Sequence, residues 1–80
     1  MAITVSAKGE VRLSSPENRK DYSLEELKAI VGGHVEIIPL LMVVNEEGIL
    51  ERLPINQQAT NVYGSLIVGD VLICRADEIK

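Results

Sequence analysis

Short runs in which apolar and polar residues alternate make up much of this chain, and this period of two is typical of strands that are buried on one face. Alternating or fully aliphatic runs cover residues 3–7, 11–13, 34–38, 41–44, 49–53, 66–68 and 71–74. A Gly-Glu pair at 9–10 predicts an opening hairpin between the first two runs. Gly69-Asp70 fits either a two-residue hairpin loop or a bend that opens the last strand.

The segment Asn45-Glu46-Glu47-Gly48 carries a strong turn signal. Asparagine suits the first position of a type I turn, and glycine suits a left-handed fourth position. The aliphatic runs at 41–44 and 49–53 are therefore predicted to pair as a hairpin around this turn.

Two short helices are predicted between the strands. Ser23 and Glu26 form a capping box in front of an apolar stripe over residues 24–31, and Gly32-Gly33 ends that helix. A helix of about two turns is not stable alone in water, so we expect it to pack on a sheet.

Asn56 is placed to cap a second short helix, which Gly64 ends. Together these elements predict one α+β domain over residues 1–80. We expect a small, strongly curved, mostly antiparallel sheet or partial barrel of five or six strands, with the two short helices packed on it.

Composition narrows the classes of function. The formal net charge of −4, with scattered basic residues, disfavours direct binding of nucleic acid through its phosphates. The longest apolar run, residues 37–44, is interrupted by Pro39 and is far shorter than the ~20 residues of a membrane helix. One cysteine and no signal-peptide pattern favour the cytoplasm, without a membrane partner or a cofactor.

Several short segments of the sequence, at set spacings, carry a resemblance to a known family. They are Leu24-Glu25-Glu26-Leu27, Val31-Gly32-Gly33, Glu36-Ile37, Val43-Val44-Asn45-Glu46-Glu47-Gly48, Leu53-Pro54-Ile55-Asn56, Ala59-Thr60 and Ile67-Val68-Gly69-Asp70-Val71-Leu72. This string resembles a family of small domains of unknown function encoded by phages, conjugative elements and their hosts, notably Gram-positive gut bacteria. The resemblance implies an intracellular accessory protein of a mobile element or its host, and it brings no catalytic residues with it.

Four polar residues are candidates for binding a small polar ligand such as a nucleotide. Asn56, Gln57, Thr60 and Asn61 lie four apart in two pairs, so a helix would display two adjacent columns of amide and hydroxyl groups. Alternatively, Asn56 caps the helix, Thr60 packs under the sheet, and the other two are solvated.

The aliphatic runs supply candidates for an interface. Leu41, Met42, Val43 and Leu66 could form a surface for a partner protein or for self-association, because a short chain has few residues to cover them. Alternatively, the two helices bury them.

Other chemistry-bearing residues have structural explanations. His34 could pair with Glu36 on one strand face, but a lone histidine on a half-buried strand is usually structural. We predict that Glu46-Glu47 lies in a solvated turn and that Asp70 is a turn residue. Cys74 is predicted to be a small buried hydrophobic residue.

The sequence therefore predicts a non-enzymatic interaction module that acts through protein contacts. A binder of a small polar ligand is one alternative. Another is an acidic inhibitor of a host nucleic-acid-binding protein, which the mobile-element context invites.

Overall fold

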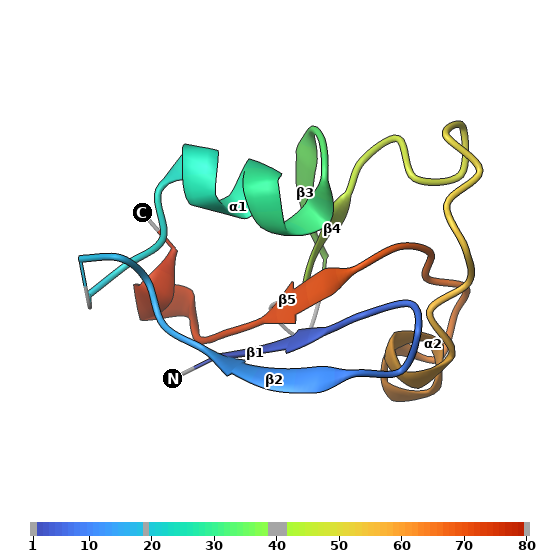
Figure 1. The fold of residues 1–80 in the computed structure, drawn as a ribbon, viewed down its shortest axis with the longest axis horizontal. Coiled ribbons are helices and arrows are strands. Elements are labelled where there is room, and N and C mark those ends of the chain that lie inside the picture. The colour runs from blue at the N-terminus through green and yellow to red at the C-terminus, as the bar shows by residue number, and fades with distance from the viewer. Residues whose placement is uncertain (1, 19, 39–41, 80) are drawn as a thin grey trace.

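A computed structural model shows one open sheet of five antiparallel strands with helices packed against it (Figure 1). The structure describes residues 2–18, 20–38 and 42–79. The strands are β1 (Ala2–Val5), β2 (Val11–Ser14), β3 (Val35–Ile38), β4 (Met42–Asn45) and β5 (Val71–Ile73). Their order is β2-β1-β5-β4-β3, so β2 and β3 form the two edges. The α+β prediction is confirmed, and the sheet is not closed into a barrel.

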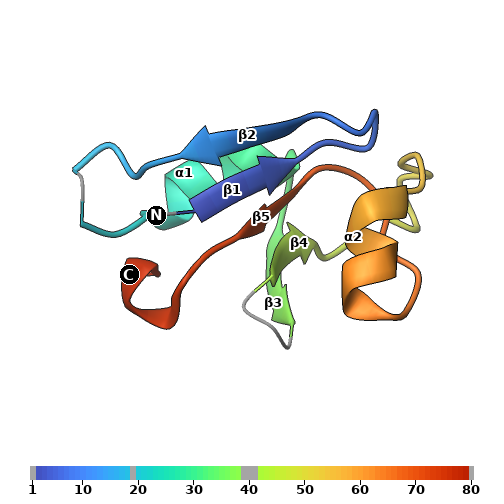
Figure 2. The same cartoon turned by 90° about the horizontal axis from the view of Figure 1, so that it is seen from below.

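Two α-helices and one 3₁₀ turn complete the described part of the fold. They are α1 (Leu24–Val31), α2 (Gln57–Tyr63) and η1 (Ala76–Glu78). Helix α1 covers one face of the sheet, which we call the upper face, and α2 lies against one end of the opposite, lower face (Figures 1 and 2).

The upper face holds the first part of the core. Val43 and Leu72 lie opposite each other on β4 and β5, and both are fully buried. They pack with Leu27 and Val31 of α1 in one cluster. Full burial of one such aliphatic side chain contributes roughly 1.5–3 kcal/mol to the stability of the fold. This cluster therefore holds α1 on the sheet.

On the lower face, the pairing register of the strands places aliphatic side chains next to one another in rows. Val5, Val71 and Met42 are buried there beneath Ala59 of α2 and Ile67 of the following loop. Because successive side chains on a strand point to opposite faces, Met42 and Val43 belong to different halves of the core.

The predicted ends of both helices are confirmed. The Ser23 hydroxyl accepts from the Glu26 amide at 3.2 Å, and the Glu26 carboxylate accepts from the Ser23 amide at 3.0 Å. Gly32 ends α1 with a φ of 79°, a left-handed conformation that glycine adopts without steric cost. The Asn56 side chain caps α2, and Gly64 ends it with a φ of 91°.

Tyr22, just before the first cap, belongs to the same core cluster as Leu27. Its hydroxyl lies 2.6 Å from the Ser14 hydroxyl on β2, which ties the loop before α1 to the sheet edge. Burial raises the pKa of Tyr22 and the bond to Ser14 partly offsets this effect.

The predicted hairpin between residues 41–44 and 49–53 is wrong. Strand β4 pairs with β3 and β5, while residues 46–52 form a turn in which Ile49 and Leu50 are 70% and 81% exposed. Asn45 drives this outcome, because its side chain accepts from the Glu47 amide and donates to the Glu51 carboxylate, which curls the chain away from the sheet.

Gly48 is also used differently from the prediction. Its φ is not positive, and the left-handed residue of the turn is Arg52 with a φ of 56°. Gly48 instead permits close packing, because a Cβ atom there would lie 2.8 Å from the Val68 side chain.

The opening hairpin of β1 and β2 is confirmed. At Gly69-Asp70 the chain makes the bend, the second of the two predicted alternatives. Val68 bridges Ile55 in another part of the chain, and β5 begins only at Val71. The sheet therefore has five strands.

Candidate functional site: an apolar pocket with an acidic rim

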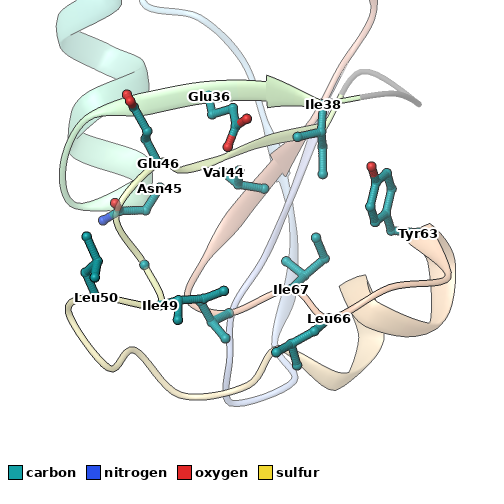
Figure 3. Close-up of a pocket in the computed structure, with 12 residues that line it drawn as sticks. Glu36, Ile38, Val44, Asn45, Glu46, Ile49, Leu50, Tyr63, Leu66 and Ile67 are labelled. Atoms are coloured by element: carbon teal, nitrogen blue, oxygen red, sulfur yellow. The ribbon is translucent and has the colours of Figure 1, made fainter.

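A pocket of about 230 Å³ opens on the lower face of the sheet beside β3 and β4 (Figure 3). Three segments enclose it: the two strands, the turn that follows β4, and the chain from the end of α2 to residue 68. The lining residues are Glu36, Ile38, Val44, Asn45, Glu46, Gly48, Ile49, Leu50, Tyr63, Leu66, Ile67 and Val68.

The wall away from the sheet is made of aliphatic side chains that face solvent. Ile49, Leu50 and Leu66 are 70%, 81% and 55% exposed. Figure 3 shows Ile49 and Leu66 on the side of the space that faces Ile38 and Tyr63. Such a cluster of exposed aliphatic residues around one hollow marks a binding surface more often than scattered single residues do.

The opposite wall is continuous with the core. Ile38 and Tyr63 pack against the buried lower-face cluster, to which Ile67 belongs. Because the core holds these side chains from behind, this wall of the pocket is fixed by packing.

Carboxylates supply the charge at the rim. Glu36 points from β3 toward the space in Figure 3, whereas Glu46, which follows β4 and also lines the pocket, directs its carboxylate away from the space. Both residues are exposed, and none of the described residues that line the pocket is a lysine or an arginine. The arrangement can therefore take up an apolar group and hold a cationic group beside it.

Asn45 lines the pocket but has no free polar atoms to offer a ligand. Its amide nitrogen donates to the Val31 carbonyl at 3.2 Å and to Glu51 at 2.9 Å, and its oxygen accepts from Glu47. The side chain thus joins the end of α1 to the turn that forms part of the pocket wall.

The four predicted ligand residues fall into two pairs in the structure, one bonded inside the fold and one exposed. Asn56 is fully buried and bonded to the backbone, and the Thr60 hydroxyl bonds the amide and carbonyl of Ile67. Gln57 and Asn61 are exposed, and the Gln57 amide donates to Asn61 at 3.0 Å. The alternative of capping and packing therefore describes Asn56 and Thr60.

The predicted interface residues are also separated. Leu41 lies outside the described residues. Met42 and Val43 are 0% exposed because α2 and α1 cover them from opposite sides, so they do not form a surface in the folded chain. Leu66 is exposed and lines the pocket.

The remaining candidates lie apart from the pocket. His34 approaches Glu47 at 4.0 Å rather than Glu36, and both partners are largely exposed. Asp70 accepts from the Ala7 amide at 2.9 Å and so bonds the β1–β2 turn, not its own backbone. Cys74 is buried, and this burial raises the pKa of its thiol.

Sequence reasoning missed Ile49, Leu50 and Tyr63. The first two were assigned to a strand, although charged residues flank this aliphatic pair on both sides. A short apolar pair inside a charged turn is a signal for an exposed contact, and it could have separated these residues from the sheet.

Among the described residues, no three His, Cys, Asp or Glu side chains gather where a metal ion could bind. No helix in the described part of the chain is long and apolar enough to cross a membrane.

The fold and the pocket define a small α+β domain with an open sheet and an apolar hollow at one edge. The chain matches a family model over residues 1–80, and it belongs to this family, Domain of unknown function (DUF3846). No curated protein and no solved structure matches it.

Proposed function

We propose that this domain is a non-enzymatic protein-binding module that takes an apolar side chain of a partner into the pocket. The observation that carries the proposal is the wall of Ile49, Leu50 and Leu66, which face solvent around a preformed hollow. Covering these side chains with a partner removes apolar surface from water, which is the main source of affinity in such contacts.

The charge at the rim selects the partner. Glu36 and Glu46 border the hollow, so the favoured segment carries lysine or arginine next to its apolar residue. A small polar ligand fits this pocket less well, since its buried amide, on Asn45, is already bonded.

Replacing Leu66 with aspartate tests the proposal. The probe is a peptide library in which a central Leu, Ile, Met or Phe is flanked by Lys and Arg, by Ser, or by Asp and Glu. We expect the basic peptides to bind best, and Leu66→Asp to weaken them at least about tenfold, because it removes apolar contact and buries a carboxylate. Fluorescence polarisation measures the dissociation constants.

The matched control is Val62→Asp. Val62 is 59% exposed, close to the exposure of Leu66, but it does not line the pocket. It should leave peptide binding unchanged, and both variants should melt within a few degrees of the parent because both sites are exposed. Equal binding by both variants, or no preference for basic peptides, would contradict the proposal. If the protein dimerises and Leu66→Asp abolishes the dimer, the pocket would instead serve self-association.

A second candidate function is inhibition of a nucleic-acid-binding protein by an acidic surface. The net charge of −4 and the exposed carboxylates Glu46, Glu47 and Glu51 support it. This function predicts binding to a basic protein that weakens steeply in salt and survives Leu66→Asp. Either role suits a cytoplasmic accessory protein of a phage or conjugative element, which we include in the proposal.

A further inference from the structure

The edge strand beside the pocket has a free side. Strand β3 stands last in the sheet and pairs only with β4. Among the described residues, nothing pairs with its outer edge. A free edge exposes a row of backbone donors and acceptors, which proteins use to bind extended peptides.

The register shows which backbone groups point outward. The His34 carbonyl accepts from the Glu46 amide at 2.7 Å, so His34 and Glu46 form a hydrogen-bonded pair. Such pairs alternate along an antiparallel ladder, so Glu36 also bonds toward β4. The N–H and C=O groups of Val35 and Ile37 therefore face the free edge.

The side chains of β3 set what an added strand would meet. Glu36 and Ile38 point to the lower face and line the pocket, while Ile37 lies on the upper face and is 48% exposed. A strand paired with Ile37 thus places one side chain beside Glu36 and another beside Ile38, at the mouth of the pocket.

We infer that the partner segment binds as an extra strand, antiparallel to β3, with an aliphatic residue beside Ile38 and a lysine or arginine beside Glu36. Read from its N-terminus, the segment has the pattern aliphatic, any residue, basic. This inference rests on the proposed function and specifies the backbone conformation and the sequence order of the partner.

A second copy of the chain meets like charge at this edge in the register that uses both Val35 and Ile37 of each copy. If two β3 strands pair with Val35 opposite Ile37, Glu36 faces Glu36 of the other copy, and like charges directly opposite destabilise a sheet. The register that pairs Val35 with Ile37 therefore favours a different chain, which carries a basic residue beside Glu36.

The experiment uses fluorescent ten-residue peptides that are threonine-rich apart from a central Leu-Thr-Lys. The comparison peptides carry Leu-Thr-Glu or the reversed order Lys-Thr-Leu, and fluorescence polarisation gives the dissociation constants. We expect Leu-Thr-Lys to bind at least about tenfold more tightly than either. The variant Glu36→Lys should invert the preference toward Leu-Thr-Glu, because it reverses the charge on β3.

N-methylation of the peptide separates strand addition from simple pocket binding while leaving the protein unchanged. A methyl group on the amide of the central threonine removes the donor that pairs with Ile37, and should weaken binding at least about tenfold. A methyl group on the lysine amide, which points away from β3, should have a much smaller effect. Equal effects of the two methyl groups, or equal binding of the reversed peptide, would overturn strand addition.

The outcomes also separate this inference from the proposed function. Peptides that lose binding to Leu66→Asp but tolerate methylation at the threonine would show pocket binding without strand addition. Peptides that depend on the threonine amide but not on Leu66 would support the edge and contradict the pocket. Absence of binding by every peptide would contradict both.

Discussion

Replacing Asn56 with alanine is expected to lower the free energy of unfolding by about 3 kcal/mol. The side chain is 0% exposed, its amide donates to the Val5 carbonyl at 2.8 Å and the Gly69 carbonyl at 2.9 Å, and its oxygen accepts from Ala59. Alanine removes these three buried hydrogen bonds to backbone groups, each costing about 1–3 kcal/mol in full, with partial relief from water. Urea unfolding measures the change.

Two variants control for the location and chemistry of this effect. Gln57→Ala removes only an exposed contact with Asn61 and should change stability by less than about 0.5 kcal/mol. Asn56→Asp keeps the acceptor for Ala59 but loses both donors, so it should be at least as destabilising as alanine. A loss below about 1 kcal/mol for Asn56→Ala would show that these bonds do not hold α2 to the sheet.

Replacing Leu72 with alanine should also cost about 3 kcal/mol. Leu72 is fully buried on the central strand β5, between Thr4 of β1 and Val43 of β4, under α1. Large-to-small changes at such sites cost about 2–5 kcal/mol, because the transfer free energy is lost and a cavity remains. For a domain of this size we expect the melting temperature to fall by roughly 12–24 °C, measured by circular dichroism.

Leu50→Ala is the matched control, because it makes the same chemical change at a side chain that is 81% exposed. It should shift the melting temperature by no more than a few degrees. Comparable destabilisation by the two variants would contradict the assignment of Leu72 to the core and of Leu50 to the surface.

The helices could be predicted from the sequence because their signals are local. Ser23 and Glu26 cap α1 within one turn, and Gly32 and Gly64 supply left-handed residues directly at the helix ends. The type of fold followed from the same short-range patterns, since short helices of this kind need a sheet to pack on.

The strand pairing around Asn45 could not be predicted in the same way. Its turn chemistry is compatible with a hairpin, but β3 already pairs with β4 and β5 occupies the other side. Pairing partners come from distant parts of the chain, and periodicity within a segment does not identify them.

The candidate site could not be predicted from the sequence, for a related reason. Asn56 presents the same amide whether it binds a ligand or a carbonyl 51 residues away in β1, and only the fold decides between them. Likewise, Ile38, Leu50 and Leu66 come together through tertiary structure, so no linear motif marks the pocket.

We propose that the pocket beside β3 receives an apolar side chain of a basic partner segment. The most direct test of this proposal is a methyl ¹³C nuclear magnetic resonance titration with the Leu-Thr-Lys peptide. We expect saturable shifts of the Ile38, Ile49, Leu50 and Leu66 methyl groups, with Leu13 of the far edge strand unchanged. Shifts centred on Leu13, or none at the pocket while the peptide binds, would contradict it.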